Sequence, residues 1–232
     1  MLMRPTKETF EQWNEEHAIK HDLDKFYNHP NFFFRYIENK RVIKLINTAR
    51  IIESDKVLEV GCGAGHILEK IPIGHLYGID ISEIQIKRAK ERLGNRVELV
   101  KSPGEKIPYN DKFFDKLLCS EVIEHVMDPK PLLAEMRRVL KDEGLLSLSI
   151  PNENLINFTK KILIKLGLKR LIAPEENGWD LAAKDNLDEW HLHEFNMNLI
   201  RKYTAGIFRI ERVVAIPNFL LPFRYVIEMR KS

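Results

Sequence analysis

Residues 57–65 read Val57-Leu58-Glu59-Val60-Gly61-Cys62-Gly63-Ala64-Gly65, an apolar run of β type that ends in three glycines at alternate positions. The next six residues, 66–71, have the pattern of a helix opening. Glycine allows a sharp turn and leaves no Cβ between the backbone and a bound molecule. The stretch therefore predicts a strand, a tight turn and a helix, with a ligand lying against the turn.

The composition of the 232-residue chain is that of an ordinary globular protein, with 44% hydrophobic and 31% charged residues. A formal net charge of +3 is too small to make nucleic acid the expected partner. Cys62 and Cys119 have neither zinc-ligand nor disulfide spacing, which fits reduced thiols. Residues 1–10 hold no apolar signal region, and no apolar run is long enough to span a bilayer. These features predict a cytoplasmic protein.

No Pro-rich or Gly/Ser-rich linker divides the chain, so we expect one domain over residues 1–232. Its expected parts are an N-terminal helical cap (1–50), a cofactor-binding core (51–151), a lid insertion (152–195), and a final helix and strands (196–232). The cap is rich in aromatic residues, most of which we expect in the core. Tyr27 and Tyr36 are candidates for contact with a substrate or cofactor.

Strand patterns recur along the core at 75–80, 97–100, 114–119 and 145–150. Ser82 followed by Gln85 is a capping-box pattern for a helix, and Asp128-Pro129 opens another helix that we expect to end at Gly144. A short helix at 197–205 and two antiparallel strands at 208–216 and 225–229 follow. Strands that alternate with helices predict an α/β fold with a doubly wound, mostly parallel sheet.

Ligands of such sheets bind beyond the carboxyl ends of the strands. Gly61, Asp80, Pro103 and Ser120 all fall there, so four separate stretches are expected to meet at one crevice. Either a dinucleotide or the adenosyl group of S-adenosylmethionine could occupy it. A dinucleotide turn is spaced Gly-x-Gly-x-x-Gly, whereas this turn is Gly-x-Gly-x-Gly. Glu59 would repel a pyrophosphate and attract an ammonium or sulfonium group, which favours S-adenosylmethionine.

The glycine stretch, then 78–82 (Gly-Ile-Asp-Ile-Ser), then 114–126 with Cys-Ser-Glu-Val-Ile-Glu-His-Val at its end, resemble the successive motifs of class I S-adenosylmethionine-dependent methyltransferases. Within that class the chain most resembles the ubiquinone-biosynthesis O-methyltransferases and their uncharacterised relatives. The resemblance implies a Rossmann-like sheet of seven strands with the last strand antiparallel. It also implies that the methionine part of the cofactor lies over Gly61 and Gly63, with the ribose on Asp80.

The cofactor-binding residues expected on this basis are Glu59, Gly61, Cys62, Gly63, Gly65, Asp80, Ile81, Gly104, Glu105, Cys119 and Ser120. One position departs from the family pattern. Pro103 stands where relatives commonly carry an acidic residue for the adenine amino group. Adenine recognition would then rest on the Gly104 or Glu105 backbone, the Glu105 side chain, or packing of Ile81 on the ring.

Methyl transfer to a hydroxyl needs a base or a metal besides correct positioning. His125 follows the fourth strand of the core and is a candidate base, unless it only caps the next turn. Glu121, Glu124, His125 and His193 together resemble the divalent-metal ligands of small-RNA terminal 2′-O-methyltransferases. These four residues are therefore the expected catalytic group, with Mg²⁺, Mn²⁺ or Zn²⁺ as an optional cofactor and His191 as a competing ligand.

The helical pattern at 155–172 has lysines on one face, at 161, 165 and 169. We favour an amphipathic lid whose lysines face water. A peripheral membrane contact and an RNA contact are the alternatives, and the RNA contact has the least support.

The predicted function is transfer of a methyl group from S-adenosylmethionine to a small-molecule acceptor, with a hydroxyl favoured over nitrogen or carbon. An RNA 2′-O-methyltransferase is a further alternative, and a non-catalytic protein that binds the adenosyl cofactor is the alternative from another class. No stable protein partner is implied.

Overall fold

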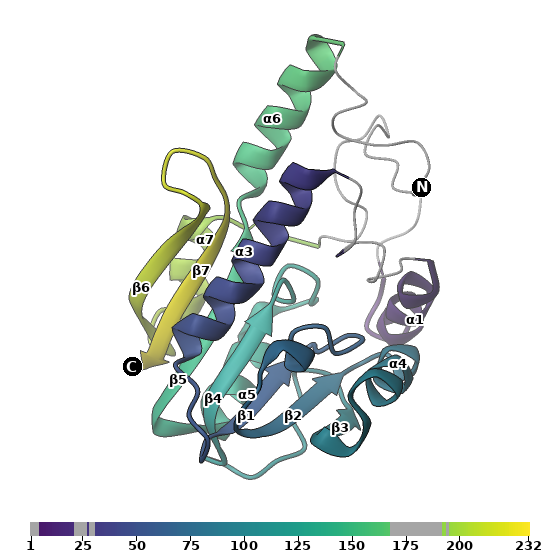
Figure 1. Ribbon diagram of the computed structural model, residues 1–232, viewed down its shortest axis with the longest axis vertical. Helices are drawn as coiled ribbons and strands as arrows, with labels where there is room; N and C mark the ends of the chain where they lie inside the picture. Colours follow the sequence, from purple (N-terminus) through teal and green to yellow (C-terminus); the bar gives the residue numbers. More distant parts are fainter. Residues whose placement is uncertain (1–4, 21–26, 28–30, 168–191, 194) are drawn as a thin grey trace.

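The computed structural model describes residues 5–20, 27, 31–167, 192–193 and 195–232. Within these residues, seven strands form one sheet in the order β3-β2-β1-β4-β5-β7-β6 (Figure 1). The strands are β1 (Lys56–Val60), β2 (His75–Asp80), β3 (Val97–Lys101), β4 (Phe114–Ser120), β5 (Leu140–Pro151), β6 (Phe208–Pro217) and β7 (Pro222–Lys231). The first five strands pair in parallel, and β7 runs antiparallel to both β5 and β6. The predicted doubly wound, mostly parallel sheet is confirmed.

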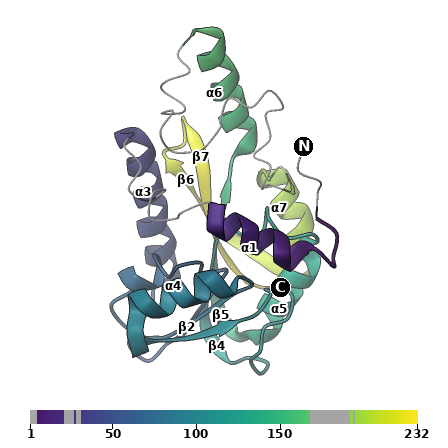
Figure 2. The ribbon, with the colours of Figure 1, turned by 90° about the vertical axis from the view of Figure 1, so that its right-hand side faces the viewer.

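Helices cover both faces of the sheet. Their bounds are α1 (Phe10–Lys20), α3 (Phe32–Ala49), α4 (Glu83–Leu93), α5 (Pro129–Val139), α6 (Glu153–Lys165) and α7 (Met197–Thr204). Figure 2 places α3 and α4 on one side of the sheet and α5 and α7 on the other. Each side has its own apolar core, one including Leu45 and Ala89, the other including Leu132 and Ile200. The sheet is therefore buried on both faces, as a parallel sheet requires.

The helix starts follow the signals in the sequence. Ser82 caps α4, because its hydroxyl accepts a hydrogen bond from the Gln85 backbone N–H at 3.2 Å. Asp128 caps α5 in the same way, with Pro129 in the first turn, where a missing N–H costs nothing. These caps fix where each helix leaves the carboxyl edge of the sheet.

The helix expected directly after the glycine turn is not formed. Residues 66–71 contain only a short 3₁₀ helix, Leu68–Lys70, and the chain is extended again at Ile71 before Pro72. Proline at 72 prevents a longer helix. The guanidinium of Arg96 donates hydrogen bonds to the backbone carbonyls of Leu68 and Ile71, each at 2.9 Å. A side chain thus satisfies carbonyls that a longer helix would have paired internally.

The expected helix end at Gly144 was also wrong. Helix α5 ends at Val139, and β5 already begins at Leu140, which pairs with Phe114 before the register shifts. A Cβ on Gly144 would lie 2.5 Å from Cδ1 of Leu140. Gly144 therefore lies in the irregular first part of β5, where the Leu140 side chain packs against it, and it does not cap a helix.

The terminal parts of the fold confirm some predictions and correct others. The predicted helix at 197–205 and the antiparallel strands that follow it are confirmed. Trp13 is buried as expected, but Phe32 and Phe33 are 73% and 50% exposed, so the core placement predicted for the cap aromatics was wrong for these two.

The predicted helix at 155–172 is observed as α6, which ends at Lys165, and its residues 168–172 lie outside the described residues. No helix in the part of the chain that the structure describes is both long and apolar enough to cross a membrane. The membrane contact of this segment stays a prediction.

We predict that Gly65→Ala lowers the free energy of unfolding by about 2 kcal/mol more than Gly206→Ala does. Both glycines have positive φ, but a Cβ at Gly65 would lie 2.6 Å from Cδ1 of Leu93 on α4, whereas nothing lies within 4 Å of one at Gly206. Urea unfolding of the two variants measures the difference. Equal losses would mean that the turn does not pack against α4 as described.

Candidate functional site

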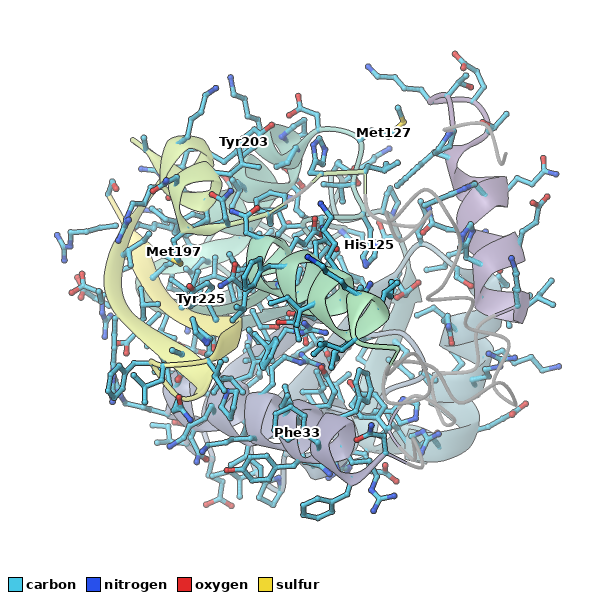
Figure 3. The ribbon with its side chains drawn as sticks, turned by 90° about the horizontal axis from the view of Figure 1, so that it is seen from above. Phe33, His125, Met127, Met197, Tyr203 and Tyr225 are labelled. Carbon is cyan, nitrogen blue, oxygen red and sulfur yellow. The ribbon has the colours of Figure 1, made fainter. Side chains whose placement is uncertain are left out.

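A cavity opens at the carboxyl edge of the sheet, above β1, β2, β3 and β4. It is lined by the four predicted positions Gly61, Asp80, Pro103 and Ser120, so the expected convergence on one crevice is confirmed. Figure 3 looks down on this edge and shows His125 between α6 and α1, with Met197 and Tyr203 of α7 to one side. The wall is completed by α1, α3 and the start of β7, which lie far from the core motifs in sequence.

The glycine turn is held against β2 by backbone hydrogen bonds. The N–H groups of Gly61 and Cys62 both donate to the carbonyl of Ile79, each at 2.9 Å. Gly61 has φ +72, and a Cβ there would lie 2.4 Å from Cγ2 of Val122. Gly63 donates its N–H to a carboxylate oxygen of Asp80 at 2.8 Å. Glycine is thus required at 61 both by the backbone conformation and by lack of space.

Glu59 places a carboxyl group at the base of the cavity. Its side chain is only 1% exposed, and among the described residues Oε2 has no hydrogen-bond partner. Burial raises the pKa of Glu59 well above its ordinary value, and the nearby Asp80 carboxylate adds to the increase, while Arg41 opposes it. A buried carboxyl oxygen without a partner is suited to a cationic ligand group.

Asp80 ends β2 and faces the same cavity. One of its oxygens accepts from Gly63 and the other from the backbone N–H of Ser82, at 2.8 and 2.9 Å. Burial raises the pKa of Asp80, and these two N–H groups counteract the increase. Each carboxylate oxygen can accept a second hydrogen bond, so the group can also bind hydroxyls of a ligand.

A buried network of charges that the sequence did not reveal forms another part of the wall. Arg41 of α3 is 2% exposed and lies 2.8 Å from Glu38, and it also donates to Tyr27, Ser120 and Ser149. Tyr27, which we had proposed from sequence, lines the cavity, whereas Tyr36 is 43% exposed and does not. Arg41 is separated from Ser120 by 79 positions, so no local motif could have indicated this contact.

Arg224 of β7 joins that network to the predicted catalytic segment. Its guanidinium lies 2.9 Å from a carboxylate oxygen of Glu121 and 3.2 Å from one of Glu38. Glu121 has φ +52, an uncommon conformation for a residue with a Cβ. Such strain tends to occur at functional sites. The ion pair holds the Glu121 side chain at the cavity wall, where Arg224 and Glu121 both lie.

Two of the four predicted catalytic residues line the cavity, and the other two lie behind its wall, where the His193 backbone N–H donates to the carbonyl of Glu124 at 3.2 Å. Glu121 and His125 line the cavity, but Glu124 and His193 do not. Glu124 is fully buried. Nε2 of His193 lies 2.9 Å from the carbonyl of Val126 and 3.2 Å from that of Met127, and because carbonyls only accept, this nitrogen must carry the proton.

No set of three or more His, Cys, Asp or Glu side chains among the described residues could hold a metal ion. The described residues thus give the metal hypothesis no support, and Nε2 of His193 instead contacts the backbone of the loop after β4. His191 lies outside the described residues.

Most of the predicted cofactor-binding residues line the cavity. These are Glu59, Gly61, Cys62, Gly63, Asp80, Ile81, Gly104, Glu105 and Ser120. Two do not: Cys119 is fully buried in the core, and Gly65 packs against Leu93 of α4. The residues around Pro103 are also tightly fitted, since a Cβ on Gly104 would lie 2.5 Å from Cδ1 of Leu132.

Comparison with known proteins gives the same family as the motifs. Residues 58–148 match the family described as "Methyltransferase domain". The chain contains a class I S-adenosylmethionine-dependent methyltransferase domain. The chain is 30% identical to the ubiquinone biosynthesis O-methyltransferase of Dechloromonas aromatica, over 59% of this chain and 65% of that protein. It is also 30% identical to an uncharacterised protein of Methanocaldococcus jannaschii, over 64% and 55% of the two chains. It thus spans less than two thirds of the length of these relatives.

Solved structures share the fold of this methyltransferase. A methyltransferase from Aquifex aeolicus superposes with a TM-score of 0.62 at 20% identity, covering 92% of this chain and 100% of that one. The [4+2]-cyclase SpnF gives a TM-score of 0.70 at 13% identity, covering 99% and 97%. At these identities the likeness extends to the fold alone. The methyltransferase family implies S-adenosylmethionine as the cofactor.

We predict that Glu59→Gln makes the ligand-free methyltransferase more stable at pH 7, by about 1 kcal/mol, while weakening cofactor binding. The raised pKa means that the folded state holds a proton that the unfolded state loses, so wild-type stability falls as pH rises above about 4.5. Chemical unfolding at several pH values should show the difference between the two proteins shrinking toward pH 4.5. A variant less stable than wild type at pH 7 would contradict this account.

Proposed function

We propose that this chain transfers a methyl group from S-adenosylmethionine to a small-molecule acceptor, with a hydroxyl as the favoured acceptor group. The observation that carries the proposal is the buried Oε2 of Glu59, which lines the cavity without a partner among the described residues. The ammonium or sulfonium of the cofactor would stabilise the carboxylate form of Glu59, which would lose its proton on binding, and the turn after β1 leaves room for the backbone to contact the methionine part. Asp80 would bind the ribose hydroxyls.

The preference for a hydroxyl has two supports. Several relatives bear the name ubiquinone biosynthesis O-methyltransferase, although each is only about one third identical to this chain. In addition, imidazoles line the cavity wall at His66 and His125, and a hydroxyl acceptor needs a base of this kind to take its proton. When bound, S-adenosylmethionine would supply an activated methyl group for the acceptor oxygen and would leave as S-adenosylhomocysteine.

Two residues of the wall would act on the acceptor, His125 as the base and Glu121 as the positioning residue, and Arg224 would fix Glu121. His125 would take the proton of the acceptor hydroxyl as the oxygen attacks the methyl carbon. Glu121, fixed by Arg224, would orient the acceptor through its second carboxylate oxygen, which is buried and has no hydrogen-bond partner among the described residues. Correct orientation can supply much of the rate of an in-line displacement. Glu121 is thus a positioning residue, and His125 is the base.

We expect S-adenosylmethionine and S-adenosylhomocysteine to bind the full chain, and NAD not to bind. The carboxyl of Glu59 would repel a pyrophosphate at the turn, where it would attract a cationic amino acid group. Calorimetric titration with each of the three compounds measures this. Binding of NAD without binding of S-adenosylmethionine would overturn the proposed function in favour of a dinucleotide-binding protein.

His125→Ala is expected to lower kcat by about 100-fold to 10,000-fold while leaving S-adenosylmethionine affinity within about twofold. His75→Ala, which changes an exposed histidine at the start of β2, is the matched control and should keep full activity. The acceptor is found first, by screening phenols, amino sugars and lipid head groups for methyl addition by mass spectrometry. An active His125→Ala variant with an unchanged pH profile would exclude His125 as the base.

A further inference from the structure

The end of the cavity next to β3 lacks the acidic residue that would bind an adenine amino group, and the residues there offer few replacements. Pro103 has no N–H and no polar side-chain atom. The hydroxyl of Ser102 donates to the carbonyl of Lys106 at 2.6 Å, so it is already in use. If this chain binds S-adenosylmethionine, as proposed above, adenine has to be distinguished from other bases either by Glu105, which lines the same cavity, or by another element.

Helix α1 lies next to α4 (Figure 2) and lines this end of the cavity, and three of its residues, Glu11, Glu15 and Ala18, fix it there. Glu15 accepts hydrogen bonds from the Ser82 hydroxyl and the Glu83 N–H at the start of α4. The remaining contacts are an ion pair of 2.6 Å between Glu11 and Lys101, the last residue of β3, and a hydrogen bond of 3.0 Å from Arg88 to the carbonyl of Ala18. The helix is thereby held over the ends of β2 and β3.

One face of α1 lines the cavity, through Phe10, Asn14 and Ala18 at intervals of four residues. The amide of Asn14 has a defined orientation, because Nδ2 donates to the carbonyl of Phe10 at 2.9 Å and a carbonyl cannot donate. Its Oδ1 therefore faces away from that carbonyl. No bond to this oxygen is found among the described residues, so it is available as an acceptor.

A second amide lies in the same wall. Gln85 of α4 is only 6% exposed and lines the cavity, and its Oε1 is buried without a hydrogen-bond partner among the described residues. Leaving such an atom unpaired costs free energy, which a ligand N–H would recover. Asn14 and Gln85 thus present two acceptor oxygens from two helices that Glu15 ties together.

We propose that Asn14 and Gln85 form the base-recognition site of this methyltransferase and select adenine through its exocyclic amino group. The amino group donates hydrogen bonds that the amide oxygens accept. The keto oxygen of hypoxanthine would face a second acceptor at Asn14, whose amide is held in one orientation by the carbonyl of Phe10. Phe10 and Ile81, which line the same cavity, supply apolar surface for the ring. The role that an acidic residue after β3 has in relatives is thereby transferred to α1 and α4.

The test compares S-adenosylhomocysteine with S-inosylhomocysteine by calorimetric titration of the full chain. The wild type should prefer the adenosyl compound by about tenfold or more, because the inosyl compound leaves the acceptors unpaired. Asn14→Leu and Gln85→Met remove an acceptor at similar volume, and each should reduce that preference by about fivefold to tenfold. Asn14→Asp and Gln85→Glu retain an acceptor oxygen and should retain the preference.

Controls separate base recognition from other causes. Gln12→Ala changes an exposed amide of the same helix and should leave both affinities unchanged. Thermal unfolding of each variant establishes that it is folded before titration. If an apolar variant does not fold, the Asp or Glu variant at the same position still tests the inference, because loss of the preference in that variant would contradict it.

Three results would overturn the inference. The first is a wild-type preference that survives both apolar substitutions. The second is a loss of affinity that is equal for the two compounds, which would mean that the amides only hold α1 in place. The third is loss of the preference in Glu105→Gln alone, which would assign the role to Glu105. If the wild type binds neither compound, the proposed function itself fails, and the inference fails with it.

Discussion

The carbonyl of Ile79 accepts hydrogen bonds from two successive backbone N–H groups, those of Gly61 and Cys62, and this shared contact positions the whole site. It draws the turn after β1 onto the end of β2, so that the Gly63 N–H reaches the carboxylate of Asp80. A side chain at 61 would collide with Val122 from the loop after β4. The ends of three strands can therefore approach one another only because the turn is made of glycine.

The approach of these strand ends also places buried ionisable side chains close together. Glu59 and Asp80 face the same cavity, and burial raises the pKa of both. Arg41 offsets part of this repulsion from the opposite side of β1, and it is itself neutralised by Glu38. A site that keeps unpaired carboxyl oxygens buried is less stable without its ligand than an apolar one would be. The free energy of unfolding of the ligand-free protein is thus lower than it would be if the site were apolar.

The helices α1 and α3 do more than cover the sheet, because their side chains form part of the cavity wall. Helix α3 places Arg41 in the cavity wall beside Ser120 of β4, while α1 lies over the end next to β3. The start of β7 contributes Arg224, which fixes Glu121 in its uncommon backbone conformation. Different parts of the chain therefore shape the two ends of the cavity.

Some of this architecture could be predicted from the sequence, because it depends on local patterns. Alternating apolar strands and capped helices predicted the parallel sheet, and the glycine spacing with Glu59 and Asp80 predicted the cofactor side of the cavity. Local pattern failed where a distant group decided the outcome. Arg96 donates hydrogen bonds to backbone carbonyls that the expected helix after the turn would have paired internally. His193, which was expected to bind a metal, lies within hydrogen-bond distance of two backbone carbonyls. The Arg41 network became visible only in the tertiary structure, because Ser120 and Ser149 lie 79 and 108 positions away from Arg41. The shared cavity wall of Asn14 and Gln85 likewise depends on the packing of α1 against α4, which spacing along the chain does not indicate.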